Sequence, residues 1–173
     1  MGQIAAYLWL YEEGSDGSVG TRIETDPQER RQTNIADVDL AGAIEVMDID
    51  AAVLVGIERR SAQSTGDRTF EPIKIRKMID STSPDLMRLA CRSPRIGGEI
   101  KFFRPTTETG GFEHFYTIVF SDARVQEIRM VLPEGLENAR VQEDVSFAYS
   151  KCKWTHPMAN KEFEDDFTVR PAA

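Results

Sequence analysis

Short runs of alternating apolar and polar residues, rich in β-branched and aromatic side chains, recur along most of this chain. Turn-forming residues separate them. Side chains alternate between the two faces of a β-strand, so each run predicts a strand, and strands this numerous predict a sandwich or barrel. The runs are IAAYLWLY (4–11), AIEVMDIDAAVLVGI (43–57), FEPIKIRKMI (70–79), GEIKFFR (98–104), EHFYTIVFSDARVQEIRMVL (113–132) and EDVSFAYSKCKWTHP (143–157).

One segment, DSTSPDLMRLACRSP (80–94), breaks the strand pattern and predicts a short helix over about residues 84–92. Ser83 can accept a hydrogen bond from the free N–H groups of the first turn, and Pro84 suits the first helical position because it lacks an N–H. The apolar residues Leu86, Leu89 and Ala90 share one face at helical spacing. We therefore expect a helix lying on a β-domain, with Cys91 packed beneath it as a small apolar residue.

Length and charge narrow the class of protein. A chain of 173 residues fits one domain, spanning 1–173, that can bury a core without disulfides or metal. Its 21 basic and 29 acidic residues give a formal charge of −8, so we expect no nucleic-acid partner. Two cysteines predict reduced thiols in a protein made in the cytoplasm. The acidic tail, about residues 157–173, is expected to lie extended along a surface.

The N-terminal run lacks the basic residues of a signal peptide and is too short to cross a membrane. We therefore expect no membrane insertion. If the protein leaves the cell, a dedicated machine must carry it.

The stretch at 143–157 gathers one of two cysteines, one of two histidines and one of two tryptophans. Read as one strand, it sets Cys152, Trp154 and His156 on one face and Phe147, Tyr149, Lys151 and Lys153 on the other. Cys152 and His156 are then about 13 Å apart, whereas zinc ligands lie within about 2.3 Å of the metal. The spacing favours a strand over a metal site or catalytic pair, and nothing requires Cys91 and His114 to complete a site across strands.

Two acidic patterns fall short of a functional site. The segment DVDLAGAIEVMD (37–48) has the spacing of a calcium loop, but Ala41 replaces an oxygen ligand and Asp48 replaces the bidentate Glu. Asp48 and Asp50 lie about 6.6 Å apart on one strand face, a separation that glycosidases use, yet no second feature supports catalysis. We expect no catalytic, cofactor-binding or metal-binding residues, no cofactor and no enzyme activity.

Two blocks carry a resemblance to a known family. The first is FEPIKIRKMIDSTSPDLMRLACRSPRIGGEIKFFRPT, with a strand, a D-x-x-S-P-x-L helix and a second strand. The second is EHFYTIVFSDARVQEI followed by EDVSFAYSKCKWTH, with the pattern E-x-V-x-F-x-Y-x-K-x-x-W-T-H. From about residue 43 to 157 their order and spacing resemble the haemolysin co-regulated protein (Hcp) family, the tube-forming proteins of bacterial type VI secretion systems.

The resemblance implies a mainly-β fold, a small β-barrel carrying the helix at about 84–92, and assembly into a hexameric ring. Rings would stack into a hollow tube that a contractile sheath drives out behind a spike protein, with small effectors in its lumen. It also implies export without a signal peptide, to the extracellular space or a target cell. Residues 12–42 depart from the family, being longer and more charged than its usual first connection.

The polar loop from Arg59 to Thr69 occupies the place of a family loop that reaches the next ring. The candidate ring-stacking residues are Arg59, Arg60, Ser61, Gln63, Thr65, Asp67 and Arg68. In HFYTIVF both strand faces are partly apolar, so we expect one to pack the core and the other to meet a neighbouring subunit.

Two alternatives remain open from the residues. One is a ligand-binding β-barrel without ring assembly, although the bulky inward candidates Phe147, Tyr149, Tyr116 and Phe120 argue for a filled interior. The other is an enzyme using Cys91 or Cys152, although neither has an obvious activating neighbour.

Overall fold

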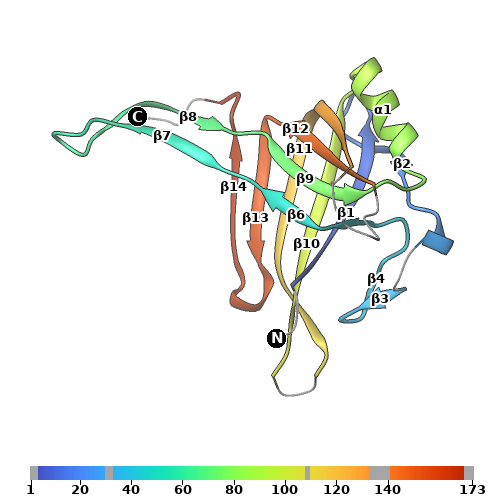
Figure 1. Cartoon of the computed structure of the whole chain (residues 1–173). Helices are drawn as coiled ribbons and strands as arrows, with labels where there is room; N and C mark the ends of the chain where they lie inside the picture. Colours follow the sequence, from blue (N-terminus) through green and yellow to red (C-terminus); the bar gives the residue numbers. More distant parts are fainter. Residues whose placement is uncertain (1–3, 30–32, 108–109, 133–140, 170–173) are drawn as a thin grey trace.

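The computed structural model describes residues 4–29, 33–107, 110–132 and 141–169, and within them a curled sheet carries a single α-helix, α1 (Ser83–Arg92) (Figure 1). The strands are β1 (Ala5–Glu13), β2 (Val19–Ile23), β3 (Asn34–Ile35), β4 (Val38–Asp39), β5 (Ile44–Val46), β6 (Asp48–Asp50), β7 (Val53–Ile57), β8 (Ser64–Phe70), β9 (Ile73–Met78), β10 (Ile96–Pro105), β11 (Phe112–Val131), β12 (Gln142–Ala148), β13 (Lys151–His156) and β14 (Lys161–Asp166). Two 3₁₀ turns are η1 (Pro27–Glu29) and η2 (Pro157–Ala159). The expected mainly-β fold with one short helix is confirmed.

The main sheet has ten antiparallel strands. Its path runs β2-β1-β10-β11-β12-β9-β6, with β13 also on β11, β14 on β13 and β5 on β1. No continuous ladder closes it as a barrel. Instead, the segment Ile44–Asp50 bridges the two sides, because β5 pairs with β1 whereas β6 pairs with β9. The expected single strand at 43–57 is therefore wrong: it is three short strands with three different partners.

Strand β11 serves both halves of the sheet because it changes partner at Asp122. Residues 117–121 pair with β13, and residues 124–131 pair with β12. Asp122 has a left-handed backbone, with φ 47°, a conformation that Asp tolerates better than most residues. Its N–H donates to the Glu13 carboxylate at 3.1 Å, and its carboxylate accepts from Ser150 Oγ at 2.6 Å.

The same change of partner corrects the reading of 143–157 as one strand. Tyr149 and Ser150 separate β12 from β13. Because these residues interrupt the alternation, Phe147 and Cys152 both point into the core instead of to opposite faces.

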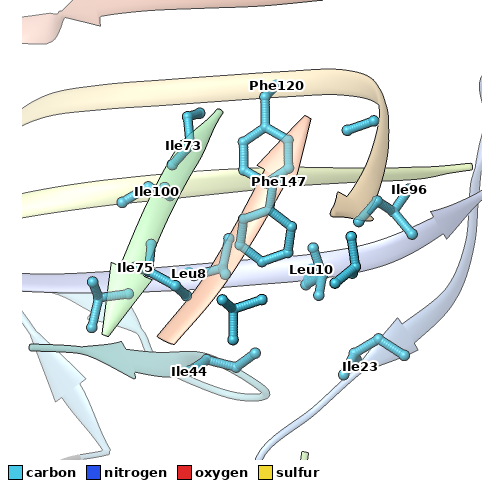
Figure 2. Packing of buried hydrophobic residues seen from close by; sticks show 14 of the residues in the cluster. Leu8, Leu10, Ile23, Ile44, Ile73, Ile75, Ile96, Ile100, Phe120 and Phe147 are labelled. Carbon is cyan, nitrogen blue, oxygen red and sulfur yellow. The ribbon is translucent and has the colours of Figure 1, made fainter. Parts of the chain in front are cut away.

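The core lies between β1, β10 and β11 on one side and β9 and β12 on the other (Figure 2). Phe120 and Phe147 stack at 5.4 Å between ring centroids, both fully buried. Branched aliphatic residues surround them: Leu8, Leu10, Ile44, Ile73, Ile75, Ile96 and Ile100. The expected inward position of the two phenylalanines is confirmed, and Tyr116 and Tyr149 pack against this core from its margin.

Helix α1 begins close to the expected residue but is capped differently. Thr82 is the N-cap residue, and its side chain makes no capping hydrogen bond. The predicted cap, Ser83, lies within the helix and its Oγ donates to Glu143 Oε1 at 2.7 Å. Cys91 is exposed, so its predicted burial is wrong. At about 100° per residue it lies on the opposite side of the helix from the buried Leu89.

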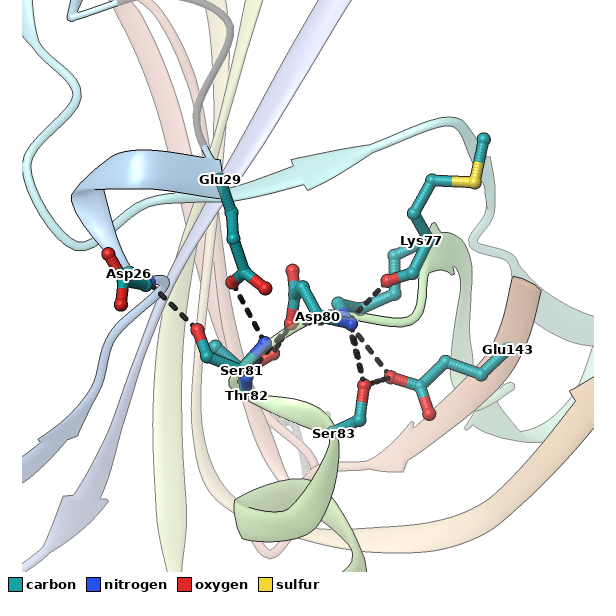
Figure 3. Close-up of polar contacts among 9 residues, drawn as sticks. Asp26, Glu29, Lys77, Asp80, Ser81, Thr82, Ser83 and Glu143 are labelled. Atoms are coloured by element: carbon teal, nitrogen blue, oxygen red, sulfur yellow. Dashed lines mark hydrogen bonds and ion pairs between the residues drawn. The ribbon is translucent and has the colours of Figure 1, made fainter. Parts of the chain in front are cut away.

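A buried ion pair fixes the start of this helix to the sheet (Figure 3). Lys77 on β9 and Glu143 on β12 are direct cross-strand partners, 0% and 1% exposed. Lys77 Nζ donates to Glu143 Oε1 at 2.8 Å, to Asp80 Oδ1 at 2.9 Å and to the Met78 carbonyl at 2.7 Å. Charges are tolerated in a protein interior only when they are paired and hydrogen-bonded, as here.

We predict that Lys77→Met destabilises the fold by about 3–5 kcal/mol, because it leaves the Glu143 carboxylate buried without its cation. The double variant Lys77→Met/Glu143→Leu should recover much of this loss. Urea unfolding measures both, and the exposed Lys74→Met on the same strand is the control, expected within about 0.5 kcal/mol of the parent. Equal stability of Lys77→Met and Lys74→Met would contradict the prediction.

Candidate assembly surfaces

Strands β7 and β8 form a separate two-stranded sheet that projects from the body as an arm, residues Val53–Phe70 (Figure 1). The large apolar side chains of β7 face solvent: Val53 is 42% exposed, Leu54 54%, Val55 50% and Ile57 61%. An isolated two-stranded hairpin is only marginally stable in water, and a cluster of exposed apolar side chains marks an interaction surface. The arm is therefore a candidate site for contact with another protein.

The structure divides the predicted stacking loop between the arm's tip and its second strand. Arg59, Arg60, Ser61 and Gln63 lie at the tip, whose turn is held by the Ala62 N–H donating to the Glu58 carbonyl at 2.9 Å. Thr65, Asp67 and Arg68 belong to β8. The segment is thus a hairpin rather than an irregular loop, and Arg68 is engaged at the base instead of being free at the tip.

The base of the arm rests on the C-terminal hairpin. Arg68 forms a bidentate ion pair with Asp165 on β14. Phe70 packs in an aromatic cluster with Tyr149, Trp154 and Phe167, at centroid distances of 5.4, 6.0 and 5.6 Å. The described part of the predicted tail, residues 157–169, consists of η2, strand β14, which pairs with β13, and a turn at 167–169.

The outer face of β6, β9, β12 and β11 is polar, in contrast to the arm. Cross-strand neighbours alternate in charge along one row, Asp48, Arg76, Asp144 and Arg129, and a second row holds Asp50, Lys74, Ser146 and Glu127. They line a groove of about 340 Å³. A hydrogen bond from the Arg76 guanidinium at 2.7 Å lowers the pKa of Asp144.

The acidic pair of the sequence, Asp48 and Asp50, lies at the edge of this mixed-charge face beside Lys74 and Arg76. The two carboxylates lie among exposed charged side chains. Catalytic carboxylates usually acquire shifted pKa values in a desolvated cleft, which differs from these surroundings.

The cysteines and histidines occupy different places in the fold. Cys152 is in the core, where burial raises its pKa to about 12, and Cys91 is exposed on α1. His114 Nε2 lies 2.7 Å from Thr117 Oγ1, and burial lowers the pKa of its ring. His156 is the last residue of β13, and its Nδ1 accepts from the Ala159 N–H at 3.2 Å. Across the described ranges no three His, Cys, Asp or Glu side chains are grouped to hold a metal.

In the described part of the chain, the phenylalanine and aliphatic cluster occupies the interior, where the ligand of the alternative barrel hypothesis would bind. An outer cavity of about 200 Å³ lies beside Trp9, Val19, Arg22 and Glu24. The ligand-binding alternative therefore finds no support.

Comparison with known proteins decides the family. The family described as "Type VI secretion system effector, Hcp" matches residues 34–156. This chain belongs to the Hcp family. The resemblance drawn from the two sequence blocks is thereby confirmed, and with it the role of an exported tube component of type VI secretion.

Relatives support this membership of the Hcp family. The "Major exported protein" of Pseudomonas aeruginosa (strain PAO1) is 30% identical over 129 residues, which are 72% of this chain and 74% of the relative. Its name supports the expected export. No helix in the described part of the chain has the length and apolar character needed to cross a membrane.

Solved structures share the Hcp fold. A crystal structure of an Hcp protein has a TM-score of 0.75 at 23% identity, covering 92% of this chain and 98% of that chain. The secreted protein Hcp3 from Pseudomonas aeruginosa has a TM-score of 0.70 at 22% identity, covering 95% and 98%. An Hcp1 variant from the E. coli pathovar EAEC 042 has a TM-score of 0.74 at 23% identity, covering 95% and 99%.

The sequence analysis predicted β-structure for Val53–Ile57 but missed the second strand of the arm, β8, and the Lys77–Glu143 pair. Signals for the arm and for the pair were present. The consecutive apolar residues of VLVGI leave no polar face for a strand on a sheet surface, and Lys77 occupies the inward position of the alternating run IKIRK.

We predict that a thiol reagent near neutral pH labels Cys91 and leaves Cys152 unreacted. Cys152 is 2% exposed, and its raised pKa keeps it protonated, whereas the thiolate is the reactive form. Mass spectrometry of the native protein should show one label, and Cys91→Ser should show none until denaturant is added. Rapid native labelling of Cys152 would contradict the buried position and reopen the cysteine-enzyme hypothesis.

Proposed function

We propose that this chain is the non-enzymatic structural subunit of a type VI secretion tube, acting as a single domain that closes into six-membered rings. The rings stack through the β7–β8 arm. The observation that carries the proposal is the arm itself, a projecting hairpin with four exposed aliphatic side chains on one strand. A tube subunit of the Hcp family has a use for such a surface, because each ring must hold the next.

Burial of the arm supplies enough free energy to join rings. Full burial of a Val, Leu or Ile side chain contributes about 1.5–3 kcal/mol, and those of β7 are about half exposed, so one arm contributes several kcal/mol. A ring presents all its arms at once. Their contributions combine because the later contacts are intramolecular, so modest single contacts give a stable junction.

The tip residues Arg59, Arg60, Ser61 and Gln63 are proposed to contact the next ring, with Thr65 and Asp67 on the adjoining strand. The arginines are suited to a polar rim around the apolar centre formed by β7, which is the usual arrangement of a protein interface. Arg68 is engaged within its own subunit.

The partners of the assembled tube are proposed to be the spike protein at its tip, the contractile sheath around it and small effectors in its lumen. We propose no nucleic-acid partner and no cofactor for this role. The net charge of −8 disfavours nucleic acid, and the cysteines and acidic pairs lie apart from one another in the fold. Export then proceeds by the secretion apparatus.

We predict that light scattering on the size-exclusion peak gives the mass of six 19.5-kDa chains and that negative-stain images of the peak show rings. Symmetric closure is the usual outcome of self-association among identical subunits. A stable monomer at high concentration in every condition would contradict ring assembly and leave the resemblance as one of fold alone.

We predict that Leu54→Asp abolishes ring stacking and leaves the ring intact. The side chain is half exposed in the free subunit, so folding tolerates the change, whereas a carboxylate in a dry interface does not. Sedimentation and negative-stain imaging at concentrations that yield tubes measure stacking. Leu54→Met is the matched control and should stack normally. Loss of the ring itself in Leu54→Asp would show that the arm closes rings instead of joining them.

A further inference from the structure

We propose that the C-terminal segment Lys161–Val169 is a brace that fixes the direction of the β7–β8 arm, with Arg68 as the positioning residue that joins the two. The inference rests on the proposed role of the arm in stacking. It assigns to Arg68 a function inside its own subunit, distinct from that of the tip residues.

The ion pair at the centre of the brace is well shielded. The side chains of Arg68 and Asp165 are only 19% and 20% exposed. The guanidinium Nε and Nη2 donate to the two carboxylate oxygens, the second at 2.6 Å. Nη2 also donates to the carbonyls of Asp166 and Val169, at 3.0 and 3.1 Å. A planar guanidinium with this many acceptors holds one geometry, because each charge-assisted bond constrains its direction.

An aromatic layer continues the contact from the arm into the body. Phe70, the last residue of the arm, contacts Phe167 of the brace and Tyr149 and Trp154 of the body. The ring centroid of Tyr149 in turn lies 6.4 Å from that of Phe120 in the core. The Phe167 N–H donates to the Ser150 carbonyl at 2.7 Å, which holds the end of the brace at the junction of β12 and β13.

The brace is itself anchored on the sheet. Strand β14 pairs with β13 along its length, with Asp165 opposite the buried Cys152. Two further ion pairs cross this hairpin, Lys153 with Glu162 at 2.9 Å and Lys151 with Asp166 at 3.5 Å. The segment Lys161–Val169 is therefore held by basic side chains on two sides, β13 and the arm.

The arm gains from such support because its connections to the body are short. It joins the body through the short links Ala51–Ala52 and Glu71–Pro72, where the Glu71 N–H donates to the Ala52 carbonyl at 2.9 Å. Arg68 lies directly opposite Val55 in the hairpin register. The brace therefore contacts the arm next to its exposed apolar residues. An arm already held in one direction loses less conformational entropy when it docks, so the brace favours stacking.

The test compares Arg68→Gln, Asp165→Asn and the double variant with Lys153→Gln, which removes an exposed ion pair from the same hairpin. Hydrogen exchange of the arm amides, residues 53–63, is measured on intact rings, together with stacking. We expect each single variant to exchange about tenfold faster in the arm and to stack more weakly. Exchange of the arm amides in the double variant should be no faster than in either single variant, because the two residues act as one pair. Ring mass and exchange in β10 and β11 should not change.

Unchanged exchange of the arm in Asp165→Asn, or equal effects in Lys153→Gln, would overturn the brace. Faster exchange with normal stacking would overturn its role in assembly. If the brace variants and Leu54→Asp all stacked normally, the proposed function of the arm in stacking would be wrong. If only Leu54→Asp lost stacking, the arm would join rings as proposed, and the inference about the brace would be wrong. Should Arg68→Gln fail to fold, Phe167→Ala tests the aromatic contact between the brace and Phe70 of the arm and is expected to loosen the arm.

Discussion

The change of partner along β11 is the feature on which the rest of the structure depends. One strand of twenty residues pairs with β10 on one side, and on the other with β13 before Asp122 and with β12 after it. Strands β12 and β13 follow one another along this edge of β11 and are separated by Tyr149 and Ser150. The left-handed backbone of Asp122 interrupts the ladder, and Glu13, Ser150 and Arg95 hold its polar groups, the last at 2.9 Å.

The strands that pair with β11 on either side of Asp122 have different roles. Strands β12 and β9 continue the wall over the core, and their inward positions hold Phe147, Ile73 and Ile75 together with the Lys77–Glu143 pair that seats the helix. Strand β13 pairs with β11, and β14, on the other side of β13, reaches the base of the arm through Asp165 and Arg68. The exposed apolar residues of β7 thus stand on a scaffold of hydrogen bonds and ion pairs, as a rigid contact surface requires.

The outward surfaces divide into apolar and charged regions, and this division suits a protein that assembles through some faces and leaves others wet. The ladder of charges on β6, β9, β12 and β11 keeps that face in water, because burying so many side chains of both signs would cost more than their pairing returns. The arm has the opposite character. The total charge of −8 says little about either surface, since the acidic tail is largely neutralised by Lys151, Lys153 and Arg68.

The sequence by itself determined the β-rich class, the helix near residues 84–92, the inward position of Phe120 and Phe147, and the Hcp family through its two motif blocks. These follow from local periodicity and from residue order, which the chain carries without knowledge of its contacts. Only the tertiary structure decided where 43–57 and 143–157 break, why Ser83 bonds to Glu143 instead of capping the helix, and which partner Arg68 holds. Each of these depends on a residue distant in sequence, whose position is fixed by the paths of β11 and β14 in space.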